Sequence, residues 1–258
     1  MFSGKSVRTK PYGLKIIGYI SMMIDHIGAV VIWPLYLVLC CPDGVFVMGD
    51  LRPHSAIVAR SVYSVMYGVG RIALPIFAFC IVYGFDHTRN KWRYVFRLLI
   101  LAIISEIPYD YAMGGVLWDC DLQNTIWGLL FGLLMLIALD RLKSNQQRIM
   151  HYIYTTLVVI ATMAVSLAFR ADGHIFTVLM IWIYYSFQER KKLFWILMIV
   201  LFVGASFLAE MEWIGIIGVL LTRLVETRKP NCKWYIYYMI YPVHFMILSL
   251  IKKILVVV

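Results

Sequence analysis

Long apolar runs, separated by short polar segments, make up most of the chain. A helix that crosses the hydrocarbon core of a bilayer needs about 20 consecutive, mostly apolar residues. Nine segments are candidates, and residues 174–188 and 212–225 are the shortest of them. The predicted helices cover residues 14–39, 57–85, 94–113, 124–140, 151–169, 174–188, 193–209, 212–225 and 234–251. The pattern predicts an all-α fold, a polytopic transmembrane bundle of about nine helices formed by one domain over residues 1–258.

The first two predicted helices are longer than a bilayer requires, which predicts an interfacial or broken portion in each. The first apolar run is too long for a signal peptide and lacks a small-x-small cleavage site. We therefore expect it to remain as the first helix of the bundle.

Composition agrees with this interpretation. Hydrophobic residues make up 62% of the chain and charged residues 15%, against about 25% charged in soluble domains. The core of a soluble protein of this size does not absorb so much apolar surface, so lipid must solvate most of it. The aromatic share of 15% suits the headgroup belts of a membrane bundle. The composition predicts an integral membrane protein, and we place it in the plasma (inner) membrane of a bacterium.

The formal charge of +10 would suit nucleic acid, but the basic residues sit at alternate helix ends rather than on one face. The N-terminal set is Lys5, Arg8, Lys10 and Lys15. Acidic residues mostly fall at the opposite ends. By the positive-inside rule, the N-terminus is predicted to be cytoplasmic and, with nine helices, the C-terminus to lie outside. The five cysteines form no CxxC pair, so we expect no metal site.

An ionisable side chain within a membrane helix costs at least about 2.5–3.5 kcal/mol on insertion scales, so each one needs a reason. Asp25 and His26 lie near the middle of the first helix. Neighbouring helical residues point about 100° apart, so the two need not share a partner. One interpretation is a buried polar pair that ties this helix to an Arg. The other is a catalytic His, oriented by a carboxylate, that exchanges protons near neutral pH.

Arg71 lies in the second helix, four residues before Pro75. The proline removes a backbone hydrogen bond and should open the helix there, freeing carbonyls that must face protein or a water-filled cavity. Arg71 is then either an ion-pair partner for Asp25 or a clamp for phosphate or a developing oxyanion.

Two further sets of polar residues lie at membrane depth. Glu106 and Asp110 are four apart on one face of the third helix, so they either hold an acceptor or cap neighbouring helices. Asn124 and Asp172 are grouped with them as candidate acceptor-binding residues, with helix capping and a structural turn as their alternative roles. His244, next to Pro242 in the last helix, is a second deep histidine and an alternative base.

Basic residues at the predicted cytoplasmic ends are candidates for binding the phosphates of a donor. They are His87, Arg89 and Arg97. A plain positive-inside loop explains the same residues.

These polar blocks inside apolar helices resemble the TraX family, named for the F-pilin acetylase of conjugative plasmids. The resemblance runs along nearly the whole chain. It rests on residues 14–17, 24–28, 70–79, 84–85, 87–89, 97–98, 105–110, 124, 172–173 and 241–244. The first two helices also resemble, more loosely, the acyltransferase-3 membrane proteins.

The resemblance implies transfer of an acetyl group from acetyl-CoA to an acceptor at the membrane. Members of such families modify different acceptors, so the acceptor stays open between a protein N-terminus, a glycan and a small molecule. Besides lipid and the acyl-CoA donor, we expect no nucleic acid partner, and a homo-oligomer stays open. In the mechanism that we expect, His26 is the general base, Asp25 orients it, and Arg71 stabilises negative charge. Glu106 and Asp110 would line an outer vestibule for the acceptor.

Two other functions fit the same residues. A proton-coupled transporter or flippase would use the deep Asp, His and Arg as a relay and clamp. A structural subunit of an assembly complex would simply pair these charges with one another. Binding of CoA separates the first hypothesis from both.

Overall fold

The computed structural model describes residues 12–41, 53–142, 148–225 and 234–255. Its elements are α1 (Tyr12–Ile27), the π-helical turn η1 (Gly28–Ile32), α2 (Trp33–Leu39), α3 (His54–Gly70), α4 (Ala73–His87), α5 (Lys91–Gly114), α6 (Thr125–Leu142), α7 (Arg148–Ala168), α8 (His174–Phe187), α9 (Lys191–Ser206), the 3₁₀ turn η4 (Glu212–Ile214), α10 (Gly215–Leu224) and α11 (Trp234–Leu255). Lys5, Arg8 and Lys10 lie outside the described residues.

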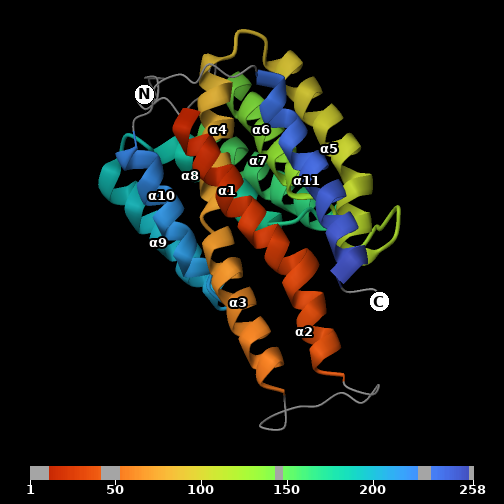
Figure 1. Cartoon of the computed structure of the whole chain (residues 1–258). Coiled ribbons are helices and arrows are strands. Elements are labelled where there is room, and N and C mark those ends of the chain that lie inside the picture. Colours follow the sequence, from red (N-terminus) through yellow and green to blue (C-terminus); the bar gives the residue numbers. More distant parts are fainter. Residues whose placement is uncertain (1–11, 42–52, 143–147, 226–233, 256–258) are drawn as a thin grey trace.

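The all-α prediction is confirmed. The described residues hold helices and a single isolated β-bridge, between Gln123 and Ala171. The helical units correspond to the nine predicted segments, because α1, η1 and α2 run on as one helix and α3 continues into α4 (Figure 1). Five units in the described part of the chain are long and apolar enough to cross a membrane: Gly13–Leu39, His54–His87, Thr125–Leu142, Ile149–Ala168 and Tyr237–Leu255.

Both long units are interrupted, as predicted. In the first, the helix widens into the π-helical turn η1 just before Pro34, which has no N–H to donate. In the second, the α-helical pattern gives way to a turn at Arg71 and Ile72, where the N–H of Ile72 bonds to the carbonyl of Val69, three residues back. Pro75 cannot donate to the carbonyl four residues back, which is that of Arg71. The two interruptions lie directly beside Asp25, His26 and Arg71.

The helices α2 and α3 form a hairpin that projects beyond the other helices (Figure 1). It has a small apolar cluster of its own, built from Tyr36, Cys40, Ala56 and Ala59. A separate main cluster joins the rest of the bundle. The two interruptions therefore stand where the hairpin meets the main body.

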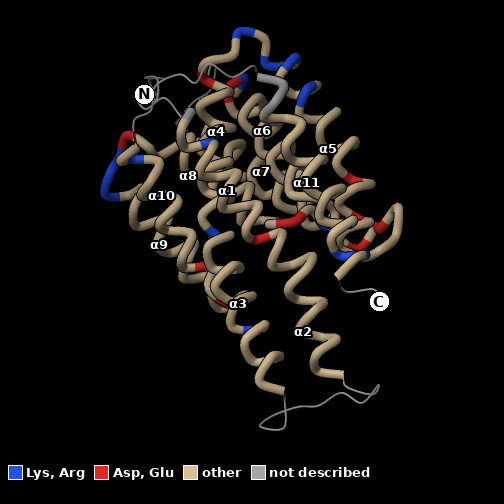
Figure 2. Tube along the Cα trace, in the orientation of Figure 1, with Lys and Arg blue, Asp and Glu red and all other residues tan. Residues whose placement is uncertain are grey.

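Charges are unevenly placed along the bundle (Figure 2). Lys and Arg gather at the turn between α4 and α5 and at the turn between α8 and α9. Asp and Glu lie mostly in the middle of the molecule and around the connection between α5 and α6. This separation is the one expected of alternate helix ends on two sides of a membrane.

Candidate functional site

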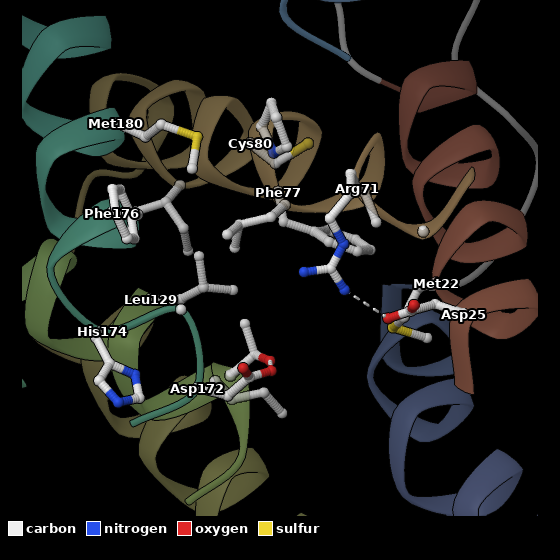
Figure 3. A pocket seen from close by; sticks show the side chains of 18 of the residues that line it. Met22, Asp25, Arg71, Phe77, Cys80, Leu129, Asp172, His174, Phe176 and Met180 are labelled. Atoms are coloured by element: carbon white, nitrogen blue, oxygen red, sulfur yellow. Dashed lines mark hydrogen bonds and ion pairs between the residues drawn. The ribbon is translucent and has the colours of Figure 1, made fainter. Parts of the chain in front are cut away.

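A cavity of about 570 Å³ lies within the bundle. Its walls come from α1, from the junction of α3 and α4, and from α5, α6, the end of α7, α8, α9, η4 and α11. Figure 3 shows part of this lining. Asp25, His26 and Arg71 all line it, together with Asp172 and Glu212. Three of the ionisable residues that the sequence places deep in the membrane, Asp25, His26 and Arg71, thus meet around one space.

Arg71 holds two carboxylates. Its Nη2 lies 3.1 Å from Oδ2 of Asp25, and its Nη1 lies 2.9 Å from Oε1 of Glu212. The guanidinium also lies 4.1 Å from the centre of the Tyr67 ring, which adds a cation–π contact. Because one cation faces two carboxylates, and Asp172 lines the same cavity, acidic groups outnumber basic ones here.

The close approach of α1 and α3 depends on Gly70. A Cβ atom at this position would lie 2.4 Å from Cβ of Asp25, far inside van der Waals contact. Glycine therefore lets the backbone of α3 pass directly against Asp25 and brings Arg71 within reach of it.

The two deep histidines form a pair. Nδ1 of His26 lies 2.7 Å from Nε2 of His244, and the rings are nearly parallel, with 4.9 Å between their centroids. Nδ1 of His244 lies 3.0 Å from the carbonyl oxygen of Ile240. Both side chains are buried, at 6% and 5% exposed, between Tyr241 and Phe245.

This geometry assigns the tautomers of the neutral pair. The carbonyl of Ile240 only accepts, so Nδ1 of His244 carries a proton and Nε2 of His244 is an acceptor. His26 must then donate from its own Nδ1. Among the residues that the structure describes, the lone pair of His26 Nε2 is left without a partner. A buried imidazole in the cavity wall with a lone pair available is the arrangement of a general base.

The orienting group differs from our expectation. We predicted that Asp25 orients His26, whereas Asp25 binds Arg71 and His244 takes the orienting position. The cause is the 100° between neighbouring side chains on a helix, which directs the two residues to different partners.

The profile of the TraX protein family matches residues 12–252. The chain belongs to the TraX family. The matched range includes every residue that lines the cavity. The chain is also similar to the probable fimbrial assembly protein FimC, serogroup H1, of Dichelobacter nodosus. The two are 24% identical over 270 residues, which cover 97% of this chain and 99% of that protein. No solved structure matches the chain.

Three of the predicted acceptor-binding residues of this TraX-family chain lie away from the cavity. Oε1 of Glu106 accepts from the Asn124 backbone N–H at 3.1 Å, and its Oε2 accepts from Asn124 Nδ2 at 2.6 Å and Trp127 Nε1 at 2.5 Å. Oδ1 of Asn124 accepts from the N–H of Ile126, so Asn124 caps α6. Asp110 accepts from the N–H of Asp119. Glu106 and Asp110 are each 1% exposed. Glu106 therefore joins α5 to the start of α6, and Asp110 holds the connection between them, rather than lining a vestibule.

Asp172 is the predicted acceptor-binding residue that does line the cavity. It precedes Gly173, whose φ of 77° turns the chain from α7 into α8. Thr125, at the start of α6, donates to Oδ2 of Asp172 at 2.6 Å. Figure 3 shows Asp172 on the other side of the cavity from Arg71.

The predicted donor-binding residues lie at the basic end of the bundle and not among the residues that line the cavity. His87 stacks on Tyr83, and Arg89 is exposed in the following turn. Arg97 lies 5.8 Å from the ring of Tyr94, which does line the cavity.

Glu212, Lys15 and His174 also line the cavity, although no sequence pattern predicted a role for them there. The contact of Glu212 with Arg71 spans 141 positions, so no local pattern indicates it. An Arg with a single expected partner was nevertheless a signal to search for a second. Among the described residues, no group of three His, Cys, Asp or Glu side chains is arranged to hold a metal ion.

Proposed function

We propose that this chain is a membrane-embedded acyltransferase, which moves an acetyl (acyl) group from its CoA thioester to an amine or hydroxyl of an acceptor. The observation that carries the proposal is the His26–His244 pair. It leaves one unshared imidazole nitrogen in the wall of a cavity that also holds a fixed Arg. The family's named activity supports acetyl as the group transferred.

In this mechanism the acceptor loses its proton to Nε2 of His26 as its lone pair attacks the thioester carbonyl carbon. The C–S bond then breaks, and the departing CoA thiolate takes the proton from the imidazolium. Direct transfer forms no acyl-enzyme intermediate, so the site does not have to protect such an intermediate from water. His244 acts as a positioning residue, because it contacts His26 rather than the reacting atoms.

Arg71 supplies positive charge near the developing oxyanion. Both of its terminal nitrogens bind carboxylates, which together cancel its charge, so in this mechanism Arg71 exchanges one of these ion pairs for the oxyanion as the thioester is attacked. The basic end of the bundle, including Lys15, Arg89 and Arg97, attracts the phosphates of CoA. On the orientation that we propose, this end is cytoplasmic.

We propose further that the acceptor is a component of a fimbria or pilus, or of the system that assembles it. The similar protein of Dichelobacter nodosus carries the name of a fimbrial assembly protein. We therefore place a pilus subunit first among acceptors to be tried, with a glycan and a small molecule next.

The test is transfer of label from radioactive acetyl-CoA to added acceptors by the purified protein in nanodiscs. CoA should also raise the melting temperature of the wild-type protein. A matched control is His54→Ala, because His54 is exposed at the start of α3, away from the cavity. Absence of both CoA stabilisation and label transfer, with a folded protein, would exclude the proposal.

A second candidate is a proton-coupled transporter or flippase. Interrupted helices beside buried charges, as at η1 and at Arg71, are typical of transporter sites. This candidate predicts proton-coupled uptake into vesicles and no stabilisation by CoA.

A further inference from the structure

One wall of the cavity is apolar and has no part in the transfer chemistry described above. It is formed by Leu129 of α6, Phe176 and Met180 of α8, and Phe202 and Ala205 of α9. Figure 3 shows Leu129, Phe176 and Met180 facing Arg71 and Asp25 across the cavity. We call this surface the apolar wall. A two-carbon acetyl group leaves most of such a surface without contact, because a cavity of about 570 Å³ is large enough for a ligand of many more atoms.

Some residues that line the cavity are also exposed at the surface of the bundle. Two of them are Leu167, at 56%, and Leu208, at 76%. Leu167 lies near the end of α7, a helix apolar enough to span a membrane and little buried by the rest of the bundle. Leu208 follows the end of α9, beside Phe207, which is 85% exposed. Exposed apolar side chains on a membrane-spanning bundle face lipid, so we infer that a mouth at Leu167 and Leu208 joins the cavity to the hydrocarbon.

We propose that the apolar wall and its lateral mouth bind an aliphatic chain, whose polar end lies at Arg71, Asp25 and His26. Water is a poor occupant of a surface built from Leu, Phe, Met and Ala side chains, because it finds few hydrogen-bond partners there. An alkyl chain fits a lipid-facing mouth, since its tail stays in hydrocarbon at every stage of entry.

Two sources supply such a chain. It is either the acyl chain of a long-chain acyl-CoA or the tail of an amphiphilic acceptor that enters from the bilayer. The role of the aliphatic chain in a reaction rests on the proposed acyl transfer, but the binding of the chain does not. The excess of carboxylates around Arg71, from Asp25, Glu212 and Asp172, favours an end group that is neutral or cationic over an anionic one.

The experiment uses photo-crosslinking in nanodiscs with a hexadecyl chain that carries a terminal diazirine. One arm supplies it as the acyl-CoA thioester and the other as the primary amine, hexadecylamine. Labelled peptides are located by mass spectrometry. We expect label within residues 174–180 and 201–209.

The blocking variant is Ala205→Phe, because Ala205 is 2% exposed and lines the cavity. The larger side chain would occupy cavity space that the alkyl chain needs, so labelling should fall at least about fivefold. Its matched control is Val203→Phe on the same helix. Val203 is 50% exposed and is not one of the lining residues, so the Val203→Phe protein should be labelled as strongly as the wild type.

A second pair of variants guards against misfolding of Ala205→Phe. Leu208→Asp puts a carboxylate at the exposed mouth and should lower labelling, whereas Phe207→Asp, more exposed and not a lining residue, should not. Label from the thioester alone assigns the chain to the donor, and label from the amine alone assigns it to the acceptor. Label spread over the lipid-facing surface and unchanged by Ala205→Phe and Leu208→Asp would overturn the inference.

The two proposals fail separately. Crosslinking requires no turnover, so specific labelling without acetyl transfer keeps the chain site and removes the acyltransferase. Acetyl transfer without specific labelling keeps the acyltransferase and removes the chain site.

Discussion

Two buried polar clusters lie in this bundle, and they use their hydrogen bonds in different ways. The cluster of Glu106, Asn124 and Trp127 joins α5 to α6, and its donors and acceptors are directed at one another. The pair of His26 and His244 leaves one imidazole nitrogen unshared in a cavity wall. A membrane makes both clusters costly, so cost alone does not separate structure from chemistry. A lone pair that faces a cavity and has no partner among the described residues does distinguish a catalytic cluster from a structural one.

The sharpest test of this contrast is His26→Ala. Loss of the general base should lower kcat about 10²–10⁴-fold, while the melting temperature should fall less than in Glu106→Ala, because one buried acceptor, Nε2 of His244, loses its partner. Radioactive acetyl transfer and thermal unfolding measure the two effects. A folded His26→Ala protein with wild-type kcat would remove His26 from the catalytic role.

Arg71→Met tests how far the cavity depends on its ion pairs. The change leaves Asp25 and Glu212 partly buried without their cation, which costs about 3–5 kcal/mol of stability when a buried pair is broken. Unfolding in a mild detergent series measures the loss. A variant as stable as wild type would mean that the two carboxylates have other partners.

Glu106→Ala should act in the opposite sense to His26→Ala. It leaves the buried donors of Asn124 and Trp127 unpaired, at about 1–3 kcal/mol for each. We expect a lower melting temperature and an unchanged KM for acetyl-CoA in the protein that remains folded. If kcat fell without loss of stability, the α5–α6 cluster would belong to the chemistry after all.

His244→Ala removes the acceptor that holds the His26 ring. We expect kcat to fall about 10–100-fold with little change in KM, as for loss of a partner that orients a functional histidine. Because Gln also offers an acceptor oxygen, His244→Gln should recover part of the rate. Equal rates in the Ala and Gln variants would contradict a positioning role.

The smallest effect belongs to Arg89, which lies in neither cluster. It is exposed at the basic end of the bundle, so Arg89→Ala should raise the KM for acetyl-CoA only about twofold, and added salt should abolish the difference. An effect that persists at high salt would place Arg89 in direct contact with the donor.

The amino-acid pattern was sufficient for the all-α fold and for the interruptions of the two long helices. Apolar length, Pro34 and Pro75 act locally, so their effects are readable from the residues themselves. It also picked out Asp25, His26, Arg71 and His244, because an ionisable group in an apolar run is anomalous wherever the run packs.

Which of these residues meet was decided by the tertiary structure. Glu212 reaches Arg71 across 141 positions and His244 reaches His26 across 218, and no local pattern encodes such distances. Glu106 and Asp25 are both carboxylates within apolar helices, so the sequence does not distinguish them. In the folded bundle Glu106 binds Asn124 between two helices, whereas Asp25 lines a cavity. Helix periodicity specifies the direction of a side chain on its own helix, but the groups that it meets depend on how separate helices pack, and only the folded bundle determines that.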